Sequence, residues 1–317
     1  MNKDLTFMSA MQIRQLITDR DLSPVELTEH FLDRIGTYNP QLNAYLTVSS
    51  DVALSAAAAA EQAVVRGDDL GELHGIPISV KDLENTAGIR TTAGSLIFKD
   101  RVPQVDSVVV QRIKAAGAVI LGKTNTPEFG LSGHTQNRLG DHCRNPWDIS
   151  RTTGGSSGGA GASLASGLCS LATGSDGGGS IRIPASFCGV YGIKPTQGRV
   201  PIYAGVTAPL SINLFSQPGP MSRTVRDSAA LLRVLAGHDS RDVGSLRDAP
   251  QDYRVAPDLG VSGIRIGWSP DFGFASVDRQ VLAQAYQGAR VFEDLGCFVE
   301  DLDPIIDEPW ESFWQLF

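Results

Sequence analysis

Two glycine-rich segments mark the centre of the sequence, Arg151-Thr-Thr-Gly-Gly-Ser-Ser-Gly-Gly-Ala-Gly161 and Gly174-Ser-Asp-Gly-Gly-Gly-Ser-Ile-Arg-Ile-Pro184. They surround three serines, Ser156, Ser157 and Ser180, with residues too small to build a hydrophobic core. Glycine adopts backbone conformations closed to other residues and lets a ligand approach the main chain closely. The composition therefore predicts a reaction site around these serines.

The overall composition is typical of a globular protein. Of the 317 residues, 42% are hydrophobic and 20% are charged, which is enough for a core and argues against disorder. The net charge is −8 and the sequence has no basic cluster, so we expect no direct nucleic-acid binding. The longest apolar run, residues 56–60, is too short to cross a membrane.

The cysteines and histidines predict neither a metal nor a cofactor. The four cysteines are scattered and form no Cys-x-x-Cys pair, and no metal-ligand spacing links the five histidines. So few cysteines in a chain of this length indicate a reducing cytoplasm. The N-terminus also lacks a basic stretch followed by an apolar run, so no signal peptide is predicted.

The spacing of apolar residues predicts alternating helices and strands. Ser9 and Ser23 precede helices, the second within a Ser-Pro-Val-Glu capping box. Further helices are predicted over residues 50–65, 105–116, 164–170, 224–236 and 277–295, and strands over 42–48, 76–82, 118–122, 190–193, 264–268 and 297–301. This alternation indicates an α/β fold with a mixed central sheet.

Two short motifs match other classes of site. Residues 117–124, Gly-Ala-Val-Ile-Leu-Gly-Lys-Thr, match the Walker A phosphate loop, but that loop follows a strand, whereas these residues themselves read as the strand. Gly-Ser-Ser-Gly-Gly at 155–159 matches the nucleophile elbow of α/β-hydrolases, with Ser157 as nucleophile. The preceding residues 145–151 look turn-like, and His238 is the one later histidine, so we disfavour this interpretation as well.

The residues themselves suggest an oxyanion site with a lysine base. The run Gly177-Gly178-Gly179 leads through Ser180 into a predicted short helix, so successive N–H groups can converge on one anion. Ser180 could also be a plain helix cap, and the loop would suit a phosphate equally well. Lys81 ends an apolar strand and becomes a base if burial removes its proton; the alternative is a surface lysine paired with Asp82.

The combined motifs resemble the amidase signature family. The resemblance rests on both glycine-rich segments and on four supporting blocks: Gly-Ile-Pro-Ile-Ser-Val-Lys-Asp at 75–82, Ala-Gly-Ala-Val-Ile-Leu-Gly-Lys-Thr-Asn at 116–125, Asn-Pro-Trp-Asp at 145–148 and Gly-Pro-Met-Ser-Arg-Thr-Val-Arg-Asp at 219–227. It runs from about the first helices to the end of the chain. It implies the amidase-signature fold, in which helices cover both faces of the mixed sheet.

The resemblance also implies a Ser-Ser-Lys triad, with Ser180 as nucleophile, Ser156 as bridging serine and Lys81 as base. The intervals agree, with 75 residues from Lys81 to Ser156 and 24 from Ser156 to Ser180. In the family the bridging serine follows a cis peptide bond, here the bond from Gly155. Ser157 is expected to orient Lys81 or the loop by hydrogen bonding. The neighbours Asp176 and Arg182 are expected to hold the loop in shape.

The function implied is hydrolysis of a small-molecule carboxamide through a seryl acyl-enzyme. Three hypotheses stay open: a stand-alone amidase, the glutamine-hydrolysing subunit of a tRNA-dependent amidotransferase, and a truncated, inactive scaffold. The partners would be a second copy of the chain or the other amidotransferase subunits. Gly177 departs from the family, where threonine, serine or isoleucine is usual, and this departure would loosen the oxyanion loop.

We expect a single amidase-signature domain in three parts. Residues 1–70 form an N-terminal helical segment, 71–237 the signature core and 238–317 the start of a C-terminal part. The chain ends in an aromatic, apolar stretch that normally continues into something that buries it. The sequence therefore predicts a chain that lacks its C-terminal part, and with it part of the acyl pocket.

Overall fold

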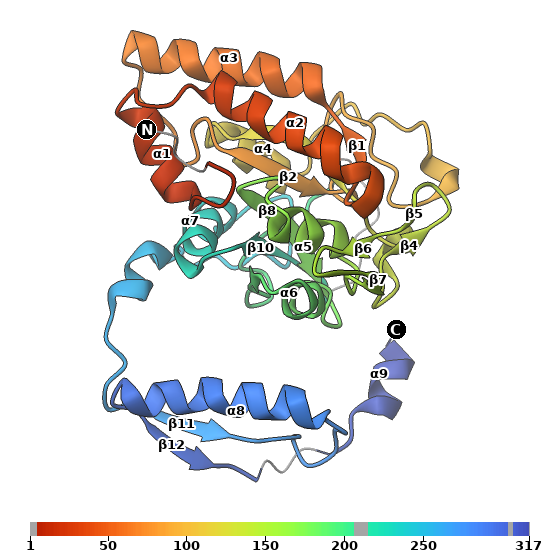
Figure 1. Ribbon diagram of the computed structural model, residues 1–317, viewed down its shortest axis with the longest axis vertical. Coiled ribbons are helices and arrows are strands. Elements are labelled where there is room, and N and C mark those ends of the chain that lie inside the picture. The colour runs from red at the N-terminus through yellow and green to blue at the C-terminus, as the bar shows by residue number, and fades with distance from the viewer. Residues whose placement is uncertain (1–4, 206–214, 304–306, 317) are drawn as a thin grey trace. The chain divides into compact units, whose positions relative to one another are not determined.

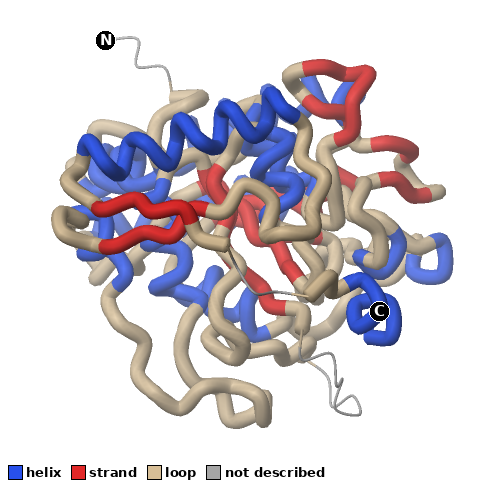
Figure 2. Tube along the Cα trace, turned by 90° about the horizontal axis from the view of Figure 1, so that it is seen from below, coloured by secondary structure: helices blue, strands red, loops and turns tan. Residues whose placement is uncertain are grey.

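The computed structural model describes residues 5–205, 215–303 and 307–316. The chain separates into two compact units, Met1–Pro257 and Asp258–Phe317. The first unit holds a six-stranded sheet in the order β1-β3-β2-β8-β10-β9 (Figures 1 and 2). Its strands are β1 Tyr45–Val48, β2 Pro77–Lys81, β3 Val119–Thr124, β8 Leu171–Asp176, β9 Tyr191–Gly192 and β10 Gln217–Ser222.

The sheet is mixed, as predicted. Strand β2 runs parallel to both β3 and β8, whereas β1, β9 and β10 pair antiparallel with their neighbours. Every residue of β2, β3, β8 and β10 is buried, so these four strands form the centre of the core. The parallel strands β2 and β8 end at the same edge, and their carboxyl ends are where ligands bind in α/β folds.

Helices and short turns surround this sheet. The helices of the first unit are α1 Ala10–Thr18, α2 Pro24–Leu42, α3 Ser50–Arg66, α4 Val108–Ala115, α5 Gly158–Ala165, α6 Arg182–Cys188 and α7 Val225–Leu235. Short 3₁₀ helices lie at η1 Leu96–Phe98, η2 Glu128–Gly130 and η3 Tyr253–Asp258. Two hairpins lie outside the central sheet: β4 Gln136–Asn137 pairs with β5 Asp141–His142, and β6 Arg144–Asn145 pairs with β7 Asp148–Thr152. The α/β prediction is confirmed.

The expected serines cap both N-terminal helices, but among the described residues the reciprocal capping box forms at Ser9 and not, as predicted, at Ser23. Ser9 forms a reciprocal capping box with Gln12. Ser23 accepts from the N–H groups of Val25 and Glu26, and Pro24 occupies the first turn. These bonds satisfy amides that have no partner within the helix, so local chemistry fixes where α1 and α2 begin.

The predicted helix over 164–170 is wrong, because the helix lies earlier, at Gly158–Ala165. The prediction followed apolar side chains, but here the small residues form the helix. A Cβ at Gly159 would lie 2.3 Å from the Asn125 nitrogen and 2.4 Å from the Ala44 oxygen. Such contacts leave room for glycine alone, so α5 packs directly against the backbone beside β3.

The second unit is a small α/β layer. Strands β11 Arg265–Trp268 and β12 Phe298–Asp301 are parallel, and helix α8 Arg279–Asp294 connects them (Figure 1). A further helix, α9 Trp310–Leu316, follows. The predicted strand, helix and strand are confirmed to within a few residues. Within the described ranges, no helix is both long and apolar enough to cross a membrane.

Candidate active site

Lys81 is the last residue of β2 and is completely buried. Its Nζ donates to Ser156 Oγ at 2.7 Å, to Ser157 Oγ at 2.9 Å and to Ser175 Oγ at 3.0 Å. The Ser175 carbonyl lies 3.4 Å from the same nitrogen. The alternative of a surface lysine paired with Asp82 is therefore wrong, because Lys81 points into a ring of hydroxyl groups.

The environment of Lys81 favours a neutral amine. Burial lowers the pKa of Lys81 to about 7, although the negative charges of Glu84 and Asp176 act in the opposite direction. Desolvation disfavours the charged form of any amine. Because hydroxyl groups both donate and accept, the ring can hydrogen-bond Lys81 with or without its extra proton. The lysine can therefore exchange a proton near neutral pH.

Ser156 and Ser157 reach Lys81 from the start of α5. The peptide bond between Gly155 and Ser156 is cis. A Cβ at Gly155 would lie 2.7 Å from the Ser132 carbonyl oxygen, and a Cβ at Gly158 would lie 2.2 Å from Thr135 Oγ1. Only glycine therefore fits on either side of the serine pair, which explains the composition of this segment.

The segment that precedes Ser157 differs from the turn that the sequence predicts. The predicted turn over residues 145–151 is confirmed only at 146–147, which join β6 to β7; the rest is wrong, because Asp148–Thr152 forms β7 and pairs with β6. A strand thus precedes the Gly-x-Ser-x-Gly motif. However, β7 is exposed along its whole length and lies outside the central sheet. Ser157 is fully buried and accepts from Lys81, so a nucleophile elbow is not formed.

Ser175 is a site residue that sequence reasoning did not identify. It lies on β8, next to Asp176, and its hydroxyl completes the ring around Lys81. Its carbonyl also accepts weakly from Ser157 Oγ at 3.4 Å, and its N–H donates to that same oxygen at 3.3 Å. Its position in the block Gly174-Ser-Asp could have indicated that Ser175 belongs to the site. The sequence did not show that residues 171–176 form a central strand beside Lys81.

Asp176 organises the loop that follows β8. Its buried carboxylate accepts from the N–H groups of Gly179 at 2.7 Å, Ile181 at 3.1 Å and Arg182 at 3.3 Å. The Arg182 guanidinium adds two bonds of 2.9 Å each. Burial acts to raise the pKa of Asp176, but the bonds from Arg182 and the backbone amides outweigh it and lower that pKa. The carboxylate is therefore a fixed anion that shapes the loop.

The glycine N–H groups predicted to bind an oxyanion differ in whether they already have a partner. The N–H of Gly179 is donated to Asp176, and Gly179 has a φ of +110°, a conformation that favours glycine. Within the part of the chain that the structure describes, the N–H groups of Gly177 and Gly178 have no protein partner. These two amides are available to a ligand oxygen. Gly177 and Gly178 therefore fit the predicted role better than Gly179 does.

Ser180 follows these glycines and is partly accessible. Its carbonyl accepts from the N–H of Ser157 at 3.1 Å, which ties the two glycine-rich segments together. Among the described residues, the Ser180 hydroxyl has no hydrogen-bond partner, and Ser156 is bonded to Lys81 instead. The structure thus joins Lys81 to Ser156 and Ser157, and places Ser180 on the adjoining loop.

The segment that matches the Walker A motif lies outside the Lys81 site. Residues Val119–Thr124 form β3, and Lys123 Nζ donates to the Glu84 carbonyl and, at 2.6 Å, to Thr86 Oγ1. Lys123 is fully buried, so it cannot serve as a phosphate-loop lysine. No group of three or more histidine, cysteine, aspartate or glutamate residues in the described ranges could hold a metal ion.

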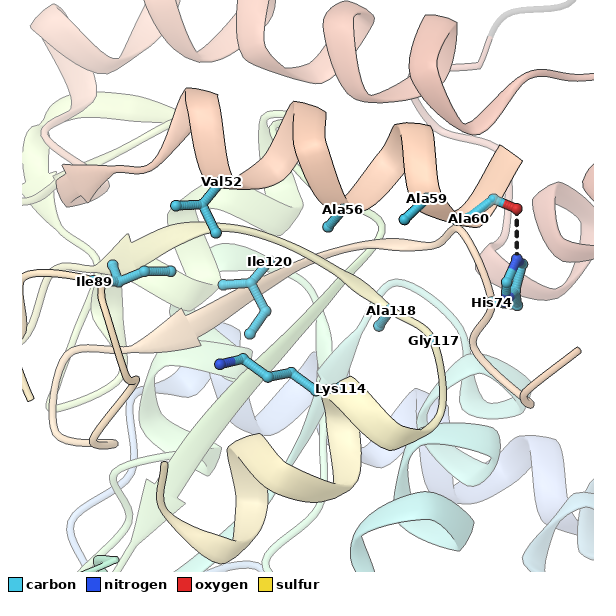
Figure 3. Close-up of a pocket in the computed structure, with 10 residues that line it drawn as sticks. All are labelled: Val52, Ala56, Ala59, Ala60, His74, Ile89, Lys114, Gly117, Ala118 and Ile120. Carbon is cyan, nitrogen blue, oxygen red and sulfur yellow. Dashed lines mark hydrogen bonds between the residues drawn. The ribbon is translucent and has the colours of Figure 1, made fainter. Parts of the chain in front are cut away.

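An apolar pocket of about 350 Å³ lies between α3 and α4, over β3 (Figure 3). His74 at its edge donates from Nε2 to the Ala60 carbonyl at 2.9 Å. Its other described lining residues are Val52, Ala56, Ala59, Ile89, Lys114, Gly117, Ala118 and Ile120. Apolar side chains line most of the pocket, and its two polar members are already bonded, His74 to Ala60 and Lys114 Nζ to Asp106 at 2.8 Å.

Comparison with known proteins identifies the family. The family model described as Amidase matches residues 26–314. The chain belongs to the amidase family. The resemblance seen in the sequence is thus confirmed, and the match extends across both structural units.

Individual members of the amidase family align along nearly the whole chain. A glutamyl-tRNA(Gln) amidotransferase subunit from Carboxydothermus hydrogenoformans is 40% identical over 299 residues, covering 94% of this chain and 61% of the relative. An acylamidase from Rhodococcus erythropolis is 39% identical over 315 residues, covering 99% and 65%. The chain therefore spans less than two thirds of the length of these relatives.

Solved structures of amidases share the fold. A bacterial aryl acylamidase of the amidase signature family superposes with a TM-score of 0.90 at 35% identity, covering 98% of this chain and 64% of that one. The peptide amidase from Stenotrophomonas maltophilia gives a TM-score of 0.83 at 32% identity, covering 93% and 62%. The amidase-signature fold predicted from the sequence is confirmed.

Proposed function

We propose that this chain carries a serine amidase site, which cleaves a carboxamide into an acid and ammonia or an amine through a seryl acyl-enzyme. The observation that carries the proposal is the buried Lys81 amine, bonded to Ser156 and Ser157 beside the loop of Ser180. A lysine with a pKa near 7 can act as a general base at neutral pH. The acylamidase and peptide amidase relatives support this chemistry.

In the proposed reaction, the substrate carbonyl oxygen accepts from the N–H groups of Gly177 and Gly178, and Ser180 Oγ attacks the carbonyl carbon. The serine proton passes through Ser156 to neutral Lys81 and returns along the same path to the leaving nitrogen. Water then repeats the attack and frees the acid. Each oxyanion donor of this kind contributes about 10²–10³-fold in rate. The sequence of steps uses no cofactor.

The pH dependence of turnover should report Lys81. Below its pKa of about 7 the lysine is protonated and cannot accept the Ser180 proton. We therefore expect kcat/KM to fall as the pH drops through 7 and to level off above it. Steady-state hydrolysis of one amide between pH 5 and 9 measures this limb, with unfolding followed at each pH as a control. A rate independent of pH over that interval would contradict Lys81 as the base.

The first experiment is turnover of a panel of amides by the 317-residue chain. Aliphatic, aryl and peptide amides should be compared with the matching esters, and released ammonia or amine measured directly. Steady release that is absent from the Ser180→Ala variant supports the proposal. Binding of an amide without turnover would favour the third hypothesis, an inactive scaffold.

A second candidate function is glutamine hydrolysis within an amidotransferase. The observation that favours it is 40% identity to the glutamyl-tRNA(Gln) amidotransferase subunit. Glutaminase activity that arises only in the presence of a copurifying partner protein would identify this function. Turnover by the chain alone, or as a homodimer, would identify a stand-alone amidase.

We also propose a cytoplasmic location and one amidase-signature domain. All four cysteines are free thiols and buried, which supports a reducing cytoplasm. The family match across residues 26–314 supports a single domain that includes both compact units. The bidentate Arg182–Asp176 pair supports the predicted role of these two residues in holding the catalytic loop.

A further inference from the structure

A small cavity adjoins the hydroxyl ring on the side of Ser175. Its volume is about 180 Å³, and residues after β2, before β10 and around the start of α4 enclose it. Glu84, Ser107, Ser175 and Tyr203 supply its polar wall, and Val108 and Ile202 part of its apolar wall. We name it the Glu84 cavity. Because Ser175 Oγ also bonds Lys81 Nζ at 3.0 Å, this cavity lies one side chain from the proposed base.

Among the described residues, the Glu84 carboxylate has no cation in direct contact. Its Oε2 accepts from Ser107 Oγ at 2.7 Å. In the described ranges, no lysine, arginine or histidine forms an ion pair with it. Its charge acts on Lys81 and Lys123, but both amines donate to other groups. Glu84 is half-buried at the cavity wall, so its carboxylate gives the cavity a negative group that a bound cation can contact.

The backbone around Glu84 is firmly held. Its N–H donates to the Lys81 carbonyl at 3.0 Å, and its own carbonyl accepts from the buried Lys123 Nζ. Lys123 also binds Thr86 Oγ1 at 2.6 Å. The turn after β2 is thus fixed from both sides, which keeps the Glu84 side chain at the cavity and close to Lys81.

We propose that the Glu84 cavity binds a protonated primary amino group, with Glu84 as its counter-ion. An ammonium carries three N–H donors, which the Glu84 carboxylate and the serine hydroxyls can accept, while the apolar wall accommodates a short alkyl chain. The amino group has two possible sources: the amide substrate itself, or the amine released by hydrolysis. The inference rests on the proposed amidase function and gives it a class of ligand.

The first arm of the test compares amides that differ only in charge. Each ω-amino amide is paired with the amide in which a methyl group replaces the ammonium: 3-aminopropanamide with butanamide, 4-aminobutanamide with pentanamide, 5-aminopentanamide with hexanamide. The measured quantity is the ratio of the two kcat/KM values within one variant, which cancels any general loss of activity. Glu84→Gln should lower this ratio about 10- to 100-fold, because a hydrogen bond to a charged group is lost. The exposed Glu29→Gln on α2 should keep the wild-type ratio.

The second arm needs no turnover. Ethylammonium binding is measured by saturation-transfer NMR, and its inhibition of butanamide hydrolysis is measured in parallel. A Kd raised at least tenfold by Glu84→Gln, without a change in the charged-to-neutral ratio, would assign the cavity to the released amine. If Glu84→Gln altered neither the ratio nor ethylammonium binding, the inference would be overturned. If no amide is hydrolysed by any variant, the proposed function fails, and ethylammonium binding still decides whether the cavity is a cation site.

Discussion

Ser180→Ala and Lys81→Ala should each reduce amide turnover by at least about 10⁴-fold, as expected for loss of a nucleophile or its base. Without Ser180 there is no oxygen to form the acyl-enzyme. Without Lys81 the ring of Ser156, Ser157 and Ser175 loses the one group able to take up a proton near neutral pH. Single-turnover and steady-state hydrolysis of one amide measure both losses.

Ser156→Ala should retain some activity, because water can replace a bridging hydroxyl and carry the proton from Ser180 to Lys81. Ser50→Ala, at the exposed start of α3, is the matched control and should behave like the wild type. A fluorophosphonate that labels activated serines gives an independent measurement: peptide mapping should find it on Ser180. Label on Ser157 with Ser180 unmodified would show that the nucleophile is assigned incorrectly.

The sequence indicated the serines and Lys81 because their segments have unusual compositions and match a family pattern. It could not indicate Ser175, because that residue joins the site only through the position of β8 beside β2. Residues 171–176, Leu-Ala-Thr-Gly-Ser-Asp, have little β propensity. Residues 171–176 form a strand because they are buried between neighbouring strands, and no local sequence pattern predicts this burial.

Strand β10 shows the same limit more strongly. Residues 217–222 read Gln-Pro-Gly-Pro-Met-Ser, and proline within a run normally argues against a central strand, since it cannot donate to a neighbour. The strand nevertheless pairs with β8 on one side and with β9 over two residues on the other. Pairing with β9 begins only at Met221 and Ser222, after the last proline. The order of partners, which the sequence does not reveal, makes these prolines acceptable.

The helix α5 illustrates a failure of a different kind. Its residues from 158 to 165, Gly-Gly-Ala-Gly-Ala-Ser-Leu-Ala, contain three glycines, which have a low helix propensity. Close packing against Asn125 and Ala44 excludes larger side chains at Gly159. Tertiary contacts therefore override local propensity where the fold brings Ser156 and Ser157 to Lys81, so a propensity-based prediction fails at the proposed catalytic position.

Asp176→Asn should lower kcat/KM about 10²–10³-fold, through loss of the preorganised oxyanion loop. Asparagine preserves the shape, but its amide has one acceptor oxygen and presents an N–H₂ group to donors. The Asp176 carboxylate receives five hydrogen bonds, from Gly179, Ile181 and three nitrogens of Arg182. Several donors would lose their acceptor, so the Gly177 and Gly178 amides would no longer be held in place.

Arg182→Gln is the matched comparison. It removes the guanidinium but leaves the backbone donors to Asp176 intact, and the Arg182 side chain is 56% exposed. We therefore expect a clearly smaller loss of activity than for Asp176→Asn. If instead the two variants lost activity equally, the loop would depend on the ion pair and not on the backbone bonds. Wild-type kcat/KM in Asp176→Asn would contradict both accounts.

The pH dependence of stability separates loop order from catalysis. The pKa of Asp176 is lowered in the folded protein, so its contribution to the free energy of unfolding is complete above the usual aspartate pKa of about 3.9 and is lost as the pH falls through the lower folded value. Urea unfolding of wild type and Asp176→Asn should therefore differ at pH 7, by about 1–3 kcal/mol for a buried acceptor, and converge in acid. The fall in kcat/KM caused by protonation of Lys81 occurs in a different pH range, near 7. The pH dependence of stability and that of kcat/KM are therefore separated by several pH units. For this reason the role of Asp176 in holding the loop and the role of Lys81 as the base can be tested independently in one protein.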